Sequence, residues 1–314
     1  MIGMLAAACV RFAPPGRIRM LVIASTDIRD IPLGLAVEDL KAQGYAVEVT
    51  SMSGGALMAD VLARGEAEIG SFNNETMWTA IGKGVRARTL LQRLSFPNLL
   101  VAKRELADCR ALAGRPVAIG AQTGINPRLV ALYLDRRCAG AAPQLLVIPD
   151  SVARTAALTA GRVDAALVPL EELVKLQLGA PGRYAALVDL TREFPLLQIA
   201  GVHARSDWLE RNPRAARDFI RALLVAHRRV IANPETLYAK VIEQLKVDRD
   251  TAKTLADASL AANAWDPNGA LTRENVQYTL NFLQDIDAVP RTLRFEDVAD
   301  LSYLDTVLAE IGRQ

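Results

Sequence analysis

Short apolar runs alternate with amphipathic stretches along the chain, and polar turns separate them. The first units are an apolar strand over 18–24, an amphipathic helix over 33–43 and a strand over 45–50. The same order returns with a strand over 116–120 and a helix that begins at Pro127. Because strand and helix alternate, the pattern predicts an α/β fold with mainly parallel sheets flanked by helices.

One pattern occurs twice, at residues 62–70 (LARGEAEIG) and 158–166 (LTAGRVDAA). Each copy ends a helix, continues through a glycine and an acidic residue, and runs into a short apolar strand. Gly65 and Gly161 suit the left-handed position just past a helix C-terminus. The repetition predicts two similar lobes.

The last third of the chain is dominated by helical spacing. An apolar stripe follows Pro213, and further helices are expected over 234–246, 249–263, 272–286 and 303–311. Strand-rich residues 88–103 and 196–204 are candidate crossings between the lobes. We therefore expect a leader over 1–17, a first lobe over 18–100, a second lobe over 101–200, and residues 201–314 returning to the first lobe.

Charge and composition argue against one class of partner. The chain has 314 residues, with 37 Lys and Arg against 35 Asp and Glu, a formal net charge of +2. A nucleic-acid surface needs clustered basic side chains, and the tight basic pairs here are only Arg136-Arg137 and Arg228-Arg229. We expect no nucleic-acid partner and, with aromatic residues at 5%, no dense aromatic cage around a ligand.

The leader, MIGMLAAAC over residues 1–9, leaves two interpretations open. It is too short to span a bilayer and lacks a basic start. The run from Leu5 to Cys9 is similar to a lipoprotein cleavage box, with Ala6 where such boxes usually carry Leu. Either the protein is exported and lipid-anchored through Cys9, or the leader is a frayed segment before Pro14.

Three cysteines and two histidines give little scope for chemistry. We expect Cys109 and Cys138 to be buried free thiols; a disulfide between them within the second lobe is the alternative in an oxidising compartment. The chain has no Cys-x-x-Cys, and its histidines are His203 and His227. We therefore expect no metal, no cofactor and no catalytic residue.

Five turns lie where a predicted strand runs into a helix, the place where α/β sheets bind small molecules. Their backbone N–H groups at helix N-termini can hold an anionic group, although the same residue types cap helices without any ligand. Arg29 and Arg128 are the nearest cations and can clamp an acid group, and Phe72 can flank an apolar ligand body. The candidate ligand-binding residues are Ser25, Thr26, Asp27, Arg29, Ser53, Gly54, Ser71, Phe72, Asn73, Thr123, Gly124, Asn126, Arg128, Pro169 and Glu171.

The two repeats, the turn over 120–124 (GAQTG) and the segment over 208–213 (WLERNP) carry a family resemblance. They resemble substrate-binding proteins of the nitrate, sulfonate and taurine class of ABC transporters, the NMT1/THI5-like and SsuA-like group. The resemblance implies a two-lobed periplasmic-binding-protein-like fold of type II with two crossing strands. It also implies a ligand held in the cleft and hinge closure that presents the loaded form to a membrane permease. The first loop, Asp27 to Pro32, departs from the Gly-rich, aromatic approach usual in the family.

We expect a periplasmic, monomeric solute-binding protein without chemistry of its own. Its solute would be a small organic anion such as a sulfonate, a carboxylate or an aromatic acid. The alternative is a cytoplasmic enzyme on the same fold, such as a chorismate-processing enzyme of menaquinone synthesis. Acid/base work would then fall to the scattered Asp27, Asp30, Glu75 or Glu171. A ligand-sensing domain of a regulator is the third possibility, although no helix-turn-helix is visible.

Overall fold

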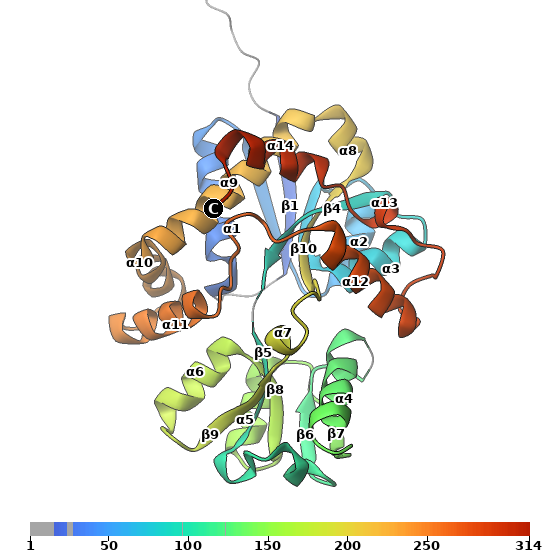
Figure 1. Ribbon diagram of the computed structural model, residues 1–314. Coiled ribbons are helices and arrows are strands. Elements are labelled where there is room, and N and C mark those ends of the chain that lie inside the picture. The colour runs from blue at the N-terminus through green and yellow to red at the C-terminus, as the bar shows by residue number, and fades with distance from the viewer. Residues whose placement is uncertain (1–15, 24–27, 96, 123) are drawn as a thin grey trace, which may run out of the picture.

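The computed structural model describes residues 16–23, 28–95, 97–122 and 124–314. The strands form two five-stranded sheets, and each sheet forms the centre of one lobe (Figure 1). The expected two-lobed α/β fold is confirmed. The leader with Cys9 lies outside the described residues, and so do the candidate site residues Ser25, Thr26, Asp27 and Thr123.

The first sheet has the strand order β2-β1-β3-β10-β4. Its first three strands are parallel, whereas β10 runs antiparallel to both β3 and β4. The strands are β1 Arg17–Ile23, β2 Ala46–Met52, β3 Ile69–Asn73, β4 Ala87–Leu94 and β10 Ala200–Arg205. The central strand β3 is buried except at its last residue, Asn73, which therefore marks where this sheet opens toward solvent or a ligand.

The second sheet repeats this topology with the order β7-β6-β8-β5-β9. Strand β6 is parallel to β7 and β8, and β5 is antiparallel to β8 and β9. The strands are β5 Asn98–Lys103, β6 Pro116–Ile119, β7 Gln144–Val147, β8 Ala165–Pro169 and β9 Tyr184–Asp189. The chain crosses between the lobes twice. It leaves the first sheet after its edge strand β4 and enters the second sheet as β5, and it leaves the second sheet after its edge strand β9 and returns to the first sheet as β10. The sequence pattern did not predict β9, which pairs on one side only and is mostly half-buried.

Helices flank both sheets, and those of the C-terminal part return to the first lobe (Figure 1). Helix α11 also reaches α6 of the second lobe, so the lobes touch outside the crossings as well. The first-lobe helices before the crossing are α1 Ile31–Ala42, α2 Gly55–Ala63 and α3 Asn74–Gly82, with the 3₁₀ turn η1 Ile28–Asp30. The second lobe has η2 Arg104–Leu106, η3 Cys109–Leu112, α4 Ile125–Arg137, α5 Ser151–Thr159, α6 Leu170–Gly179 and α7 Leu190–Glu193. The C-terminal helices are α8 Ser206–Arg211, α9 Pro213–Ala232, α10 Pro234–Leu245, α11 Arg249–Ala261, α12 Arg273–Asp285, α13 Phe295–Val298 and α14 Ser302–Ile311.

The sequence repeat forms the same local structure in both lobes. Gly65 (φ 76°) and Gly161 (φ 71°) follow the ends of α2 and α5 in the left-handed region. In each copy the glycine N–H bonds the carbonyl three residues back and the next N–H bonds the carbonyl five residues back, which is the Schellman motif. The following acid is structural in both copies, since Glu68 bonds Arg19 of β1 and Asp164 bonds Lys103 of β5.

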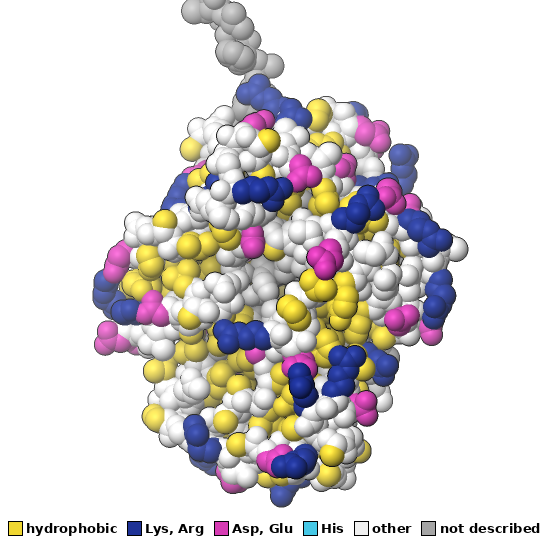
Figure 2. Space-filling model, viewed as in Figure 1, with side chains coloured by type: hydrophobic (Ala, Val, Ile, Leu, Met, Phe, Trp, Pro, Cys, Tyr) yellow, Lys and Arg dark blue, Asp and Glu magenta, His cyan; other side chains and the backbone are white. Residues whose placement is uncertain are grey.

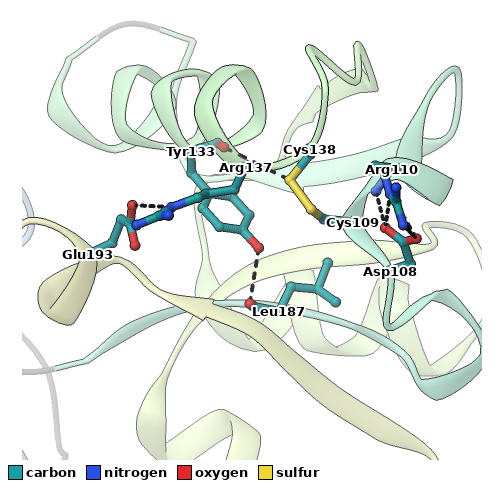
Figure 3. The surroundings of a disulfide bond; sticks show 8 residues. All are labelled: Asp108, Cys109, Arg110, Tyr133, Arg137, Cys138, Leu187 and Glu193. Atoms are coloured by element: carbon teal, nitrogen blue, oxygen red, sulfur yellow. Dashed lines mark hydrogen bonds and ion pairs between the residues drawn. A yellow bond between two sulfur atoms is a disulfide. The ribbon is translucent and has the colours of Figure 1, made fainter.

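Cys109 and Cys138 form a disulfide in the second lobe, and the expectation of free thiols was wrong (Figure 3). The bond joins η3 to the end of α4, and the Cα atoms of the two cysteines lie 5.5 Å apart. Two further contacts hold α4 in this position, because Tyr133 donates to the Leu187 carbonyl and Arg137 pairs with Glu193 (Figure 3). A disulfide of this kind is typical of proteins in oxidising compartments.

Candidate functional site

A cavity of about 380 Å³ lies where the two lobes meet. Strand ends and helix starts of both lobes contribute to its wall, together with both crossing segments. The wall is mainly polar: it holds four carboxamide side chains, three guanidinium groups and several hydroxyls among the described residues. The carboxamides are those of Asn73, Gln92, Asn98 and Asn126, the guanidinium groups belong to Arg29, Arg93 and Arg154, and the hydroxyls are those of Ser95, Ser151 and Thr191.

Two of these arginines come from the first lobe and each contacts a carboxylate. Arg93, at the end of β4, donates to the Asp30 carboxylate beside α1. Arg29 lies 3.6 Å from the Glu171 carboxylate of α6 and so spans the gap between the lobes. In both contacts an arginine of the first lobe is paired with a carboxylate, from the first lobe for Arg93 and from the second lobe for Arg29.

The third arginine, Arg154 of α5, is held by backbone carbonyls. Its Nε donates to the Leu167 carbonyl at 2.6 Å, and its Nη1 donates to those of Ile148 and Pro149, both at 2.8 Å. The residue is only 8% exposed, and burial lowers the pKa of its guanidinium. Gly120 lies beside the group, since a Cβ there would sit 3.1 Å from Nη1. The guanidinium is therefore fixed in one place at the second-lobe wall.

The start of α3 anchors the returning crossing segment to the first lobe. The Asn74 backbone N–H donates to the Ile199 carbonyl and its side chain donates to the Gln198 carbonyl, both at 2.8 Å. The Gln198 N–H in turn donates to the Thr279 hydroxyl of α12 at 2.8 Å. Ile199 and its neighbour Ala200 line the cavity, so these bonds set the position of that wall.

A buried hydrogen-bond chain lies beneath the end of β3. Trp78 donates to the Thr89 hydroxyl, which lies 3.0 Å from Nδ1 of His203, and Nε2 of His203 lies 3.1 Å from the Phe72 carbonyl. Because a carbonyl only accepts, Nε2 carries the proton and Nδ1 accepts from Thr89. Burial lowers the pKa of His203 to about 3, so the ring is neutral at neutral pH. The chain fixes the strand end that carries Asn73.

A second, more open hollow of about 670 Å³ lies between α3 and α4. At its edge the Ile125 N–H, at the start of α4, donates to the Glu75 carboxylate at 3.2 Å. Burial raises the pKa of Glu75, and the bond from Ile125 opposes that rise. Gly124 is in the left-handed region (φ 98°), and a Cβ there would come within 2.7 Å of Glu75. A first-lobe carboxylate thus occupies the N-terminus of a second-lobe helix.

The structure brings part of the sequence-predicted site together. Arg29, Asn73, Asn126 and Pro169 line the cavity, and Glu171 reaches it through Arg29. The other described candidates lie elsewhere. Ser53 and Gly54 are exposed before α2, Ser71 and Phe72 are fully buried in β3, and Gly124 and Arg128 line the second hollow. The Phe72 ring packs on His203 with ring centroids 4.8 Å apart, in the core and not at the cavity.

Sequence reasoning missed several lining residues, above all Gln92, Arg93, Asn98 and Arg154. One signal was present for Arg154, because it follows the cap Asp150 by four residues and so lies at the start of its helix. A cation there opposes the helix dipole, which indicates a role other than helix stability. The other three lie in strands whose sequences show no such signal.

Within the ranges that the structure describes, no helix is long and apolar enough to cross a bilayer. The same ranges contain no group of three or more His, Cys, Asp and Glu side chains placed to hold a metal ion. Lys and Arg are interspersed with Asp and Glu on the face shown in Figure 2, without a continuous basic area there.

Solved structures with the same fold include binding proteins of known transport systems. The periplasmic aliphatic sulphonate-binding protein SsuA from Escherichia coli matches with a TM-score of 0.71 and 13% identity, over 91% of this chain and 92% of that one. SsuA from Xanthomonas axonopodis pv. citri, bound to MOPS, matches with a TM-score of 0.67 and 14% identity, over 93% and 100%. The periplasmic nitrate-binding protein NrtA from Synechocystis PCC 6803 matches with a TM-score of 0.68 and 14% identity, over 96% and 90%.

No curated protein sequence matches this chain significantly. At 13–14% identity the structural matches establish the fold alone. The family model described as NMT1/THI5 like matches the sequence itself over residues 40–237. That match covers more than half of the chain and includes both repeats, and the chain therefore belongs to the NMT1/THI5-like family.

Proposed function

We propose that this protein is the solute-binding component of an ABC transporter. It captures a small anionic organic solute, a sulfonate, a carboxylate or an aromatic acid, in the cavity between the lobes. The observation that carries the proposal is a polar cavity whose wall comes from both lobes and contains the buried Arg154 guanidinium. Membership of the NMT1/THI5-like family and the likeness to sulfonate- and nitrate-binding proteins support it.

The lobes, residues 18–100 with 201–314 and residues 101–200, are proposed to move as two units about the crossings. Residues of both units line the cavity, so a solute that touches both walls binds the closed arrangement better than an open one. This differential affinity is what drives closure. The closed, loaded form would then dock on a membrane permease as a monomer.

The proposed location is the periplasm. The disulfide between Cys109 and Cys138 supports an oxidising compartment. In this proposal the leader directs export, and lipid attached at Cys9 is one way in which the protein would be retained at the membrane.

Binding without turnover is part of the proposal. His203 and His227 are at most 1% exposed, and burial lowers their pKa values to about 3 and about 4. Neither ring is among the described residues of the cavity wall. The carboxylates of Asp30 and Glu171 contact Arg93 and Arg29, which keeps them from acting as a pair of acid and base.

Native mass spectrometry of the protein purified from its own host tests the proposal. We expect a bound small acid that is released on unfolding, and calorimetry with that acid is expected to give one site per chain. Asn73→Ala and Asn126→Ala are expected to weaken binding, whereas Asn281→Ala, on the exposed face of α12, is the matched control. Conversion of the acid into a product, or binding that neither cavity variant changes, would overturn the proposal.

A further inference from the structure

Among the three arginines of the described cavity wall, Arg154 differs from the other two in how its charge is compensated. Arg93 bonds Asp30 and Arg29 contacts Glu171, but no described carboxylate lies within ion-pair distance of Arg154. The nearby Asp150 caps α5 by accepting from the Ala153 N–H at 2.8 Å. A buried cation is stable only when an anion or strong acceptors compensate it. Carbonyls supply acceptors for Arg154, and the Asp150 and Glu172 carboxylates act on its charge only from beyond ion-pair distance. An anion in the cavity could therefore make the direct charged contact that Arg154 lacks among the described residues.

The geometry of Arg154 leaves one side of its guanidinium available. Nε and Nη1 are occupied by the carbonyls of Leu167, Ile148 and Pro149. Nη2 has no hydrogen bond to any described residue, and the side chain lines the cavity. The three hydrogen bonds hold the Arg154 guanidinium in place before a ligand arrives, so the side chain has little conformational entropy left to lose on binding.

Besides the charged Asp150 and an apolar part that includes Leu197 and Ile199, the described wall contains many hydrogen-bonding groups that carry no charge. Asn73 and Gln92 come from strands of the first sheet, Asn98 and Asn126 come from β5 and α4, and the hydroxyls of Ser151 and Thr191 add to them. The described lining residues include no aromatic ring. An alkyl or aromatic body would strip water from these carboxamides without replacing its hydrogen bonds, and sites built this way discriminate strongly against such analogues.

We infer that Arg154 binds the single acid group of the solute and that the carboxamide wall selects a body bearing hydroxyl or amide groups. The solute class is then a polar organic monoanion, a hydroxylated or amide-bearing carboxylate or sulfonate. A simple alkanesulfonate or an aromatic acid leaves these carboxamides without partners, so we expect it to bind less tightly. The inference rests on the proposed solute-binding function and narrows its ligand.

Matched pairs of acids test whether the site prefers hydroxyl groups on the uncharged part of the ligand. Gluconate against hexanoate, and 2-hydroxyethanesulfonate against 1-propanesulfonate, differ in their hydroxyl groups and share chain length and charge. Calorimetry is expected to show at least one hydroxylated acid binding about tenfold or more tighter than its alkyl partner. Equal or tighter binding of the alkyl acids would overturn the inference while leaving the solute-binding function standing. Binding of none of the four would also overturn it, and the ligand carried through purification would then report separately on the proposed function.

Arg154→Gln tests the acid group, with Arg162→Gln, an exposed arginine of the same lobe, as the matched control. We expect Arg154→Gln to weaken binding of the preferred acid about 10- to 100-fold and Arg162→Gln to leave it unchanged. Glucitol, the uncharged counterpart of gluconate, separates charge from structure, because a misfolded wall lowers affinity for both compounds. Where Arg154→Gln fails to fold, Gly120→Ala keeps the charge and shifts Nη1 by a few tenths of an ångström, because its Cβ would lie 3.1 Å from that atom. Unchanged affinity of the acid in the variant that folds would overturn the role of Arg154.

Discussion

Arg29 of the first lobe lies 3.6 Å from Glu171 of the second, and this ion pair joins η1 to α6 beside the cavity. The Glu171 side chain is 8% exposed, so the pair is better shielded from water than a surface salt bridge. A second contact between the lobes is the hydrogen bond from the Ile125 N–H of α4 to the Glu75 carboxylate of α3. The lobes are thus held together by polar contacts that do not require a solute.

Removing the first of these contacts is expected to favour opening. In Glu171→Gln the charge opposite Arg29 is lost, and we expect the ratio of closed to open molecules to fall by a factor of about 2 to 5. Small-angle X-ray scattering of the ligand-free protein measures this as a larger radius of gyration. Glu193→Gln is the matched control, because its partner Arg137 lies in the same lobe. Equal radii for wild type and Glu171→Gln would show that the pair does not hold the lobes.

The buried histidines predict a loss of stability in acid. The pKa of His203 is about 3 and that of His227 about 4, both below the ordinary value of 6.5. The unfolded chain therefore binds these protons first, so this contribution to stability is complete above about pH 6.5 and is lost as the pH falls toward 4 and 3. His203→Gln keeps a donor and an acceptor without titrating. Urea unfolding at several pH values is expected to show a flatter profile for this variant, and an unchanged profile would contradict the assignment.

Gly201 of β10 has no room for a side chain. A Cβ would lie 2.2 Å from the Asn74 carboxamide oxygen and 2.9 Å from the Thr89 methyl group. We expect Gly201→Ala to lower the free energy of unfolding by about 2–3 kcal/mol, because both neighbours are fully buried. Gly34→Ala in α1 meets nothing within 4 Å and is expected to stabilise by about 0.5–1 kcal/mol. Denaturant titration compares the two, and a Gly201→Ala variant as stable as wild type would contradict the packing described.

The disulfide is expected to stabilise the second lobe. It closes a loop with a sequence separation of 29, for which loss of the cross-link costs about 2–4 kcal/mol. The double variant Cys109→Ala, Cys138→Ala is therefore expected to unfold at lower denaturant concentration than wild type. Adding a reducing agent after unfolding is expected to bring wild type to the same midpoint. Coincident midpoints under oxidising conditions would show that the bond contributes nothing.

Much of the fold was predictable because its signals are local. The glycines at 65 and 161 end helices by a conformation that only a few neighbouring residues define, and both have positive φ as expected. The alternation of apolar runs and helical stripes identified most strands and helices to within a few residues. Strand β9 escaped prediction because it is short and half-buried, and its partner β5 lies far away in the sequence.

The candidate site was predictable only in part. Strand-to-helix turns supplied Asn73, Asn126 and Pro169, since the ends of parallel strands meet at one edge of a sheet. Gln92 and Asn98 reach the same cavity through the crossing, and Arg154 reaches it from within a helix. Their positions depend on how two lobes face each other, which no sequence window contains.

The order of residues alone was enough to predict two matched α/β lobes and a helical C-terminal part, because each follows from periodicity or turn chemistry. Three-dimensional packing was needed to pair Cys109 with Cys138, to join Arg29 to Glu171 and to leave the Arg154 charge facing the cavity. The physical reason is how far apart in the sequence the interacting residues lie. Backbone conformation responds to adjacent residues, whereas disulfides, ion pairs and cavities require atoms from distant segments to come within a few ångströms.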